Sequence, residues 1–196
     1  MELYGKNVDE WIAYWRSYVG SYDLPSWDSI PNFDLYMEQV VTFIKDALRY
    51  MGTDDTRDNI ITASAINNYV RKKFMPQPIK KRYYRKHIAY LLILCTLKQA
   101  ITISSIQAIL PMNISEEELH DFYDAFVKQH RRSAEYFMGR IGSLRDMVET
   151  DSALESLFKD NATEIIVDTA LISSFTKLLS ERLIQDKTTA HMKTGE

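Results

Sequence analysis

Five prolines interrupt a chain whose apolar residues otherwise recur at helical spacing. Proline lacks a backbone N–H, and the residue before it avoids the helical region, so helices tend to end beside it. Pro25 and Pro31 therefore bracket an extended linker, Pro76 and Pro78 end one short helix, and Pro111 ends another. The pattern predicts an all-α protein.

Apolar spacing and capping residues place the predicted helices along the chain. They lie at about 8–20, 33–50, 62–73, 85–99, 102–110, 115–149 and 161–185. Residues 79–84 are too few for a helix and predict a turn with a small strand pair. The sequence Ser115 to Glu118 is a capping box that opens the longest helix, and Gly139 and Gly142 predict a weak point within it. Ser152 to Glu155 repeats the capping-box pattern for a short helix.

These elements divide the chain into four regions. An aromatic N-terminal helix and linker occupy 1–32, and a helical module occupies 33–112. A C-terminal helical region at 113–185 is long and apolar enough to dimerise and could sense an effector. The tail at 186–196 has almost no apolar content and is predicted to be disordered.

Composition narrows the classes of protein. Apolar residues make up 45% of the chain and charged residues 26%, the balance of a soluble globular protein. Cys95 is the single cysteine, which rules out an intrachain disulfide and fits a cytoplasmic protein. The N-terminus has no signal peptide pattern, and the longest apolar run, Ile88–Cys95, is too short to span a membrane.

Charge is distributed very unevenly. The net charge is −3, yet the window from Asn59 to Ser115 contains no acidic residue and nine of the 24 basic residues. The rest of the chain carries 15 basic and all 27 acidic residues, a net charge of −12. A block of one sign suggests a partner of the opposite sign.

The basic residues of this window form three clusters, at 71–73, 80–82 and 85–86. They fall at the end of a short helix, on the following turn and at the start of the next helix, an arrangement that can hold phosphates on two sides of a groove. Asn67 and Asn68 on the short helix could bond to adenine. A solvated basic face on an ordinary domain is the alternative interpretation.

The run from Ser64 to Leu110 resembles the DNA-binding domain of MerR-type transcriptional regulators. Residues 65–69 (AINNY) sit at the recognition-helix core of that family, 74–76 (FMP) at its turn, and Arg82-Tyr83 at its wing end. Residues 101–110 (ITISSIQAIL) match its closing segment in register. With 24–27 (LPSW) and 35–40 (LYMEQV), the chain is also similar to an uncharacterised bacterial family with a MerR-like domain of unknown function.

The resemblance implies a winged helix-turn-helix module with phosphate contacts from Arg82 and Tyr83, and base or backbone contacts from Asn67 and Tyr69. Here Asn67 replaces the recognition arginine of the family, and the loop that joins the first two helices of the motif is long. The full set of candidate DNA contacts is Ser64, Asn67, Asn68, Tyr69, Arg71, Lys72, Lys73, Lys80, Lys81, Arg82, Tyr83 and Arg85.

Other kinds of site have little support. Cys95 lies on an apolar helix face and is interpreted as core. The four histidines are not paired at i, i+4, and Glu117-x-x-His120 is half of a di-iron pattern with no second copy, so no metal or cofactor is predicted. No nucleophile or paired-carboxylate pattern suggests an enzyme. Trp11, Trp15 and Trp27 are interpreted as core, with a ligand pocket as the alternative.

The sequence therefore predicts a cytoplasmic transcription regulator that binds double-stranded DNA as a homodimer. By analogy with MerR-type proteins, the helix after Ser115 would pair the two protomers. The principal rival is a protein-interaction module whose basic face docks an acidic protein. Single-stranded RNA binding through Tyr69, Tyr83 and Tyr84 is a third hypothesis. A small-molecule effector is compatible with the C-terminal region but nothing in the sequence supports one, and no membrane association is expected.

Overall fold

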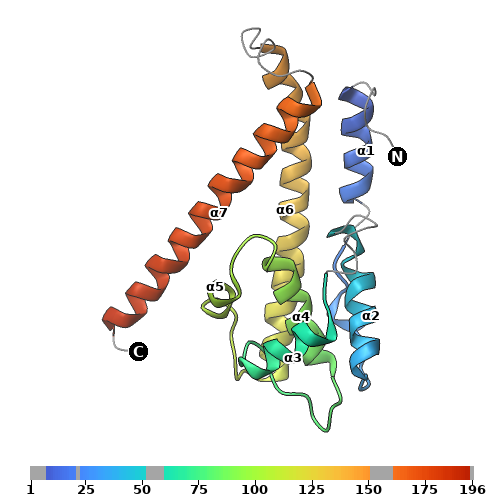
Figure 1. Ribbon diagram of the computed structural model, residues 1–196, viewed down its shortest axis with the longest axis vertical. Helices are drawn as coiled ribbons and strands as arrows, with labels where there is room; N and C mark the ends of the chain where they lie inside the picture. The colour runs from blue at the N-terminus through green and yellow to red at the C-terminus, as the bar shows by residue number, and fades with distance from the viewer. Residues whose placement is uncertain (1–7, 21–22, 52–59, 151–160, 195–196) are drawn as a thin grey trace. The chain divides into compact units, whose positions relative to one another are not determined.

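The computed structural model describes residues 8–20, 23–51, 60–150 and 161–194 (Figure 1). Over these residues the chain is helical and forms no extended strand, only two isolated β-bridges. This confirms the all-α prediction. The elements in order are α1 (Val8–Gly20), the 3₁₀ turn η1 (Trp27–Ser29), α2 (Met37–Ala47), the 3₁₀ turn η2 (Arg49–Met51), α3 (Ala63–Arg71), α4 (Arg85–Leu97), α5 (Ile103–Gln107), α6 (Glu116–Thr150) and α7 (Asn161–Thr194).

The chain divides into two compact units. One unit comprises Met1–Asp23 and His130–Leu179, and the other comprises Leu24–Gln129 and Ser180–Glu196. We call the second the core unit because every buried apolar residue of the described chain lies in it, between Leu24 and Tyr123. We call the first the peripheral unit.

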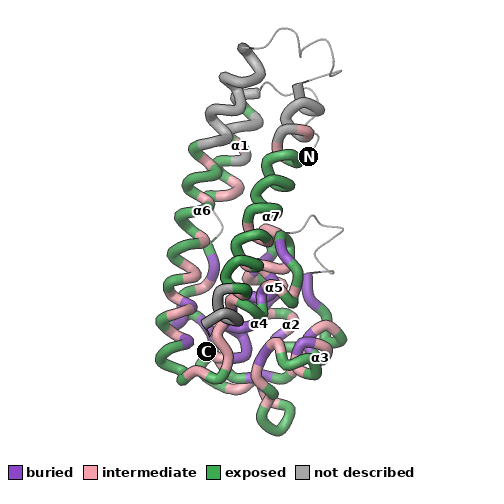
Figure 2. Tube along the Cα trace, turned by 90° about the vertical axis from the view of Figure 1, so that its left-hand side faces the viewer, coloured by how far each residue is buried: buried purple, intermediate pink, exposed green. Residues whose placement is uncertain are grey.

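Helix α4 is the centre of the core unit. From His87 to Cys95 all of its residues are buried, as the purple tube of Figure 2 shows. The helix packs against α2 and α5, and α2 also packs against α3. A helix that is apolar all round is stable only when other elements surround it, so α4 organises the rest of the core unit.

The segment before α2 differs from its prediction. Residues 24–31 were predicted to be an extended linker, but Leu24, Trp27 and Ile30 are buried in the core. The Trp27 ring stacks on the His120 ring with centroids 4.9 Å apart, and the Tyr123 hydroxyl donates to the Pro25 carbonyl at 2.8 Å. The core unit therefore starts at residue 24 rather than 33.

Helix α2 is shorter than predicted. It begins at Met37 rather than near Phe33, because Leu35 is extended and forms an antiparallel bridge with Tyr83. The side chain of Gln39 reaches back to accept the Tyr36 backbone N–H at 2.9 Å, which satisfies one free donor at the helix start. The last predicted turn is a separate 3₁₀ turn, η2.

In the peripheral unit, the described side chains include no buried residue. Asp23 and Arg131 form a two-point ion pair, with Arg131 Nε and Nη2 at 3.1 Å and 2.7 Å from the two carboxylate oxygens. Because both side chains are exposed, solvent screens this pair strongly. The side chains of Trp11 and Trp15 lie outside the described residues, so the predicted tryptophan cluster reduces to a buried Trp27.

The two long helices are more continuous than predicted. Helix α6 passes through Gly139 and Gly142 without interruption. Helix α7 continues to Thr194, so most of the predicted disordered tail is helical. Thr188 and Thr189 each donate a hydroxyl proton to the carbonyl four residues earlier, which keeps these polar groups compatible with a helix. The short helix predicted at Ser152 falls outside the described residues.

Candidate nucleic-acid interface

Helix α3 has one buried and one exposed face. Thr62 caps it by accepting the Ala65 N–H at 3.1 Å, and Ile66 and Tyr69 are buried against the core. The polar residues of the opposite face recur at i, i+3, i+4 and i+7, the spacing of a single helix face. We call this face the α3 stripe; it consists of Ser64, Asn67, Asn68 and Arg71, and with Thr62 and Ala65 it lines an open hollow of about 580 Å³.

Two residues of the α3 stripe are bonded to each other. Arg71 Nη2 donates to the side-chain oxygen of Asn68 at 2.9 Å. Arg71 is exposed, and over the described residues no carboxylate pairs with it. The amide oxygen of Asn68, which was predicted to contact adenine, is engaged within the protein.

Helix α3 ends in a motif that normally requires glycine. The N–H of Phe74 donates to the Tyr69 carbonyl at 2.9 Å, and the N–H of Lys73 donates to the Val70 carbonyl at 3.0 Å. This is the Schellman pattern, and the Tyr69 and Phe74 rings make the apolar contact that usually accompanies it, with centroids 6.5 Å apart. Lys73 occupies the left-handed position with φ 60°.

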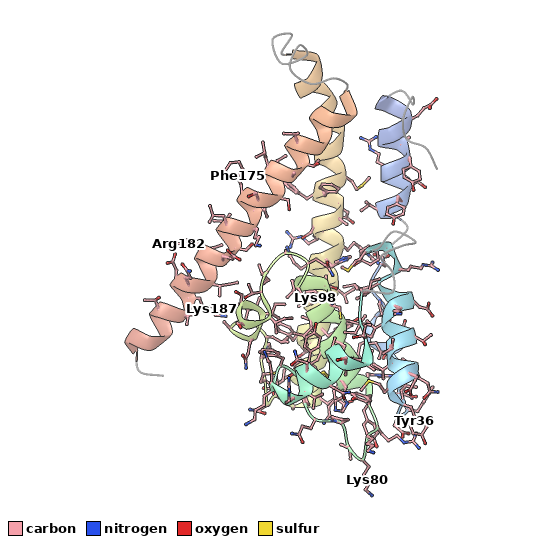
Figure 3. The ribbon with its side chains drawn as sticks, in the orientation of Figure 1. Tyr36, Lys80, Lys98, Phe175, Arg182 and Lys187 are labelled. Atoms are coloured by element: carbon pink, nitrogen blue, oxygen red, sulfur yellow. The ribbon has the colours of Figure 1, made fainter. Side chains whose placement is uncertain are left out.

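A two-residue hairpin follows the Schellman motif. Ile79 and Arg82 exchange both backbone hydrogen bonds, at 3.0 Å and 2.9 Å, and form an antiparallel bridge. Between them Lys80 and Lys81 have φ values of 51° and 64°. Two positive values identify a type I′ turn, a shape that normally takes Asn-Gly. Figure 3 shows Lys80 projecting outward from the tip.

The base of the hairpin is tied to the segment before α2. Leu35 and Tyr83 exchange backbone hydrogen bonds at 2.8 Å and 2.9 Å. Arg82 Nε lies 3.3 Å from the Asp34 carboxylate, and its Nη2 donates to the Tyr36 hydroxyl. The guanidinium carbon also lies 3.5 Å from the centre of the Tyr36 ring. These contacts hold the hairpin in place and occupy the Arg82 side chain.

Arg85 is likewise engaged within the core unit. Its Nε donates to the Ile30 carbonyl at 3.1 Å, its guanidinium lies 5.7 Å from the Trp27 ring centre, and Asp28 is at 4.0 Å. Its side chain is only 19% exposed. Arg85 therefore fastens the start of α4 to the segment around η1.

His87 joins the start of α4 to the segment just before the hairpin. The Tyr84 N–H donates to His87 Nδ1 at 2.9 Å, so the neutral ring carries its proton on Nε2, which donates to the Gln77 carbonyl at 3.0 Å. The ring is fully buried. Burial lowers the pKa of His87, the nearby Lys86 charge lowers it further, and the Gln77 bond opposes both effects.

The lysines of this surface differ from its arginines. Lys72, Lys73, Lys80 and Lys81 are all exposed, and over the described residues no carboxylate pairs with any of them. They have the properties of a surface that meets phosphate: exposed cations on a short, hydrogen-bonded segment of backbone, with no described counter-charge to displace.

The predicted contacts therefore separate into three groups. Eight lie on or beside α3 and at the hairpin tip: Asn68 is partly exposed, and the exposed residues are Ser64, Asn67, Arg71, Lys72, Lys73, Lys80 and Lys81. Tyr69 and Tyr83 were predicted as contacts, which the structure corrects, because their exposures of 6% and 3% place them in the core. Burial also raises the pKa of Tyr69 to about 12. Arg82 and Arg85 are bound internally.

The partners of Arg82 could not be identified from the sequence. Asp34 and Tyr36 lie 48 and 46 positions before Arg82 and bear no local relation to it. A backbone bridge, Leu35 to Tyr83, brings them together. No periodicity or motif in the sequence marks such a long-range pair.

Other chemistry finds no support in the described chain. No group of three or more potential metal ligands occurs among the residues described. Cys95 is buried, and burial raises the pKa of its thiol to about 11, which makes it a poor nucleophile. None of the described helices is long and apolar enough to cross a membrane.

Comparison with known proteins identifies a family. The family model described as "Domain of unknown function (DUF1836)" matches residues 25–126. The match covers just over half of the 196 residues, and the chain belongs to this family. The matched region includes α2 to α5, the hairpin and the start of α6, which together form most of the core unit. Searches of curated proteins and of solved structures gave no match.

Proposed function

We propose that the chain is a transcription regulator that binds double-stranded DNA, with α3 in the major groove and the Ile79–Arg82 hairpin as a wing on the sugar–phosphate backbone. The observation that carries the proposal is the backbone at Lys73, Lys80 and Lys81. Over the described residues, four non-glycine positions have positive φ, and three of them are these exposed lysines.

Positive φ is unfavourable for lysine. The left-handed region costs a residue with a Cβ about 1–2 kcal/mol, whereas glycine adopts it freely. Glycine or asparagine would fit a helix end or a type I′ turn better. Lysine at all three positions gives up this stability and adds three cations on the exposed side of one short segment. Strain of this kind is commonly found at binding sites.

The α3 stripe suits a groove. The major groove of B-DNA is about 12 Å wide and accepts a helix, and base edges there are read by asparagine, serine and arginine side chains. Tyr69 and Ile66 anchor the opposite face in the core, so the stripe is presented on a rigid element.

We extend the proposal to a homodimer. One small module makes too few base contacts to discriminate against a genome, and two-fold pairing doubles them. The peripheral unit supplies an unburied apolar surface for pairing. Figure 3 shows Phe175 projecting from α7, and it is 69% exposed; among the described side chains of this unit, the other large exposed apolar residues are Tyr136, Phe137, Leu171, Ile172, Leu178 and Leu179.

Salt dependence tests the DNA proposal. Anisotropy of a labelled random-sequence duplex, measured from about 50 to 200 mM NaCl, should give a log–log slope of about −0.9 per phosphate neutralised. The double substitution Lys80→Asn with Lys81→Gly keeps the type I′ turn and removes two charges. The slope should become shallower by about 1.8, while the melting temperature is unchanged or higher.

The matched control removes two charges elsewhere. Lys128→Ala with Lys187→Ala leaves the hairpin intact at the same net charge, and both lysines are exposed. This variant should keep the wild-type slope. A wild-type chain with no salt-dependent affinity for duplex would exclude the DNA proposal and favour an acidic protein partner.

Sedimentation tests the dimer. At micromolar concentration the wild-type chain should sediment as a dimer and protect a palindromic footprint. Phe175→Glu should sediment as a monomer, whereas Lys177→Glu, two residues on and so on another side of the helix, should not. A wild-type chain that stays monomeric both free and on DNA contradicts the dimer and leaves the salt-dependent contacts unaffected.

A further inference from the structure

The hydrogen bond between Arg71 and Asn68 assigns different tasks to the two side chains. Asn68 uses its only acceptor oxygen on Arg71, at 2.9 Å. Reading adenine by a bidentate bond requires that oxygen to accept from the base. The bond to Arg71 occupies one of the two lone pairs of this oxygen, so the Asn68 side chain is already engaged with Arg71 before any base is bound.

Arg71 has the properties of a base reader. It stands at the end of the α3 stripe, seven residues from Ser64, and lines the hollow beside α3. A guanidinium has five N–H donors, of which Asn68 takes one, so a two-donor edge stays free. Two parallel donors match the O6 and N7 acceptors of guanine and the acceptors of no other base in the major groove.

We infer that Arg71 reads guanine in the major groove and that Asn68 is a positioning residue which holds the guanidinium in the reading orientation. The inference rests on the proposed function and names the base that α3 recognises. Arginine has many rotamers, and ordering such a side chain on binding weakens affinity roughly 2- to 13-fold. The Asn68 bond orders it before DNA arrives.

The neighbouring lysine provides a matched control. Lys72 is exposed on the next residue, and over the described chain no carboxylate pairs with it. It has a single cationic point with rotating donors, which suits phosphate rather than a planar base edge. Loss of Lys72 should weaken all sequences alike, whereas loss of Arg71 should weaken guanine-containing sites selectively.

The experiment uses the full chain and a duplex selected by it from a random-sequence library. In a second duplex each guanine is replaced by 7-deazaguanine, which lacks the N7 acceptor. Guanine preference is the Kd for this modified duplex divided by the Kd for the unmodified one. Arg71→Lys keeps the charge and should keep the salt slope, but its guanine preference should fall by roughly 5- to 150-fold. Lys72→Ala should keep the preference and lose salt slope.

Two substitutions at Asn68 test the positioning role. Asn68→Ala should lower guanine preference by roughly 2- to 13-fold with an unchanged salt slope. Asn68→Asp retains the acceptor oxygen and should restore the preference, although its charge weakens binding to every duplex. A helix-stabilising role alone would not distinguish guanine from 7-deazaguanine.

The outcomes separate this inference from the proposed function. If Arg71→Lys keeps the wild-type guanine preference while the wild-type chain still binds duplex in a salt-dependent way, the guanine inference is wrong and the DNA proposal stands. If Asn68→Ala and Asn68→Asp behave alike, Asn68 does not position Arg71. If the wild-type chain binds no duplex, both the proposal and the inference are wrong.

Discussion

The tip and the base of the Ile79–Arg82 hairpin both carry positively charged side chains, but these side chains have different roles. At the tip, Lys80 and Lys81 have unfavourable backbone angles and meet no described carboxylate. At the base, Arg82 is bonded to Asp34 and Tyr36. Cations at the tip are therefore available to a partner, whereas the cation at the base holds the hairpin.

The difference follows from the chemistry of the two side chains. Arginine has a planar fork of donors that can bond a carboxylate and a hydroxyl while the same plane covers a ring. Arg82 does all three. Lysine is a flexible point charge that stays hydrated. The sequence clusters at 80–82 and 85–86 thus combine two roles that charge counting cannot separate.

The largest expected effect lies at the base. Tyr83→Ala removes a ring that is 3% exposed and should destabilise the protein by about 3–5 kcal/mol in urea unfolding. Its neighbour Tyr84 is 37% exposed, and Tyr84→Ala should cost less than about 1 kcal/mol. Equal losses at the two positions would show that Tyr83 is not a core residue.

A smaller loss is expected where Arg85 meets the chain before α2. Arg85→Ala leaves the Ile30 carbonyl without its donor and should cost about 1–3 kcal/mol. Lys86→Ala, one residue on, should change stability by no more than about 0.5 kcal/mol. If Arg85→Ala instead unfolds at the wild-type urea concentration but binds DNA weakly, Arg85 belongs with the tip lysines.

Low pH should destabilise the protein through His87, which bonds the start of α4 to the Gln77 carbonyl. Burial lowers the pKa of His87, so the unfolded chain binds its proton more readily than the folded chain does. Stability should therefore be constant above a pH of about 6.5 and fall below it, by up to about 1.4 kcal/mol per pH unit. Chemical unfolding between pH 7 and 5 measures this slope.

The control for the pH effect is a second histidine. Burial also lowers the pKa of His130, which Asp23 opposes, so His130 adds its own share to the acid sensitivity. His87→Asn should be less stable at neutral pH but should show a shallower slope, with the remainder removed by His130→Asn. An unchanged slope in His87→Asn would exclude His87 as the sensitive group.

The sequence predicted local features better than long-range ones. Helix α3 and the turn at 79–82 follow from apolar spacing, capping chemistry and segment length, all of which act over a few residues. The bridge from Leu35 to Tyr83 could not be predicted, because no local preference selects a partner 48 residues away. That bridge also shortens α2 and occupies Arg82.

For the candidate site, too, the sequence predicted local features but not all of its backbone geometry. An acid-free basic window identifies a charged surface, and helical phase could have shown that Tyr69 lies opposite Asn67 and Arg71. The positive φ of Lys73, Lys80 and Lys81 could not be read from the sequence, since lysine is not the residue these turns prefer. The observation that best supports DNA binding is therefore structural.

The smallest effect, and the most direct test of the tip, is at Lys73. Lys73→Gly removes a side chain from the left-handed position at the end of α3 and should stabilise the protein by about 1 kcal/mol. The same change removes one cation, so the salt slope on duplex DNA should become shallower by about 0.9. Stability and affinity should thus move in opposite directions. Lys72→Ala, at the adjacent position without positive φ, should lose affinity without gaining stability. If Lys73→Gly stabilises the chain and binds DNA as the wild type does, Lys73 is a strained residue without a phosphate contact.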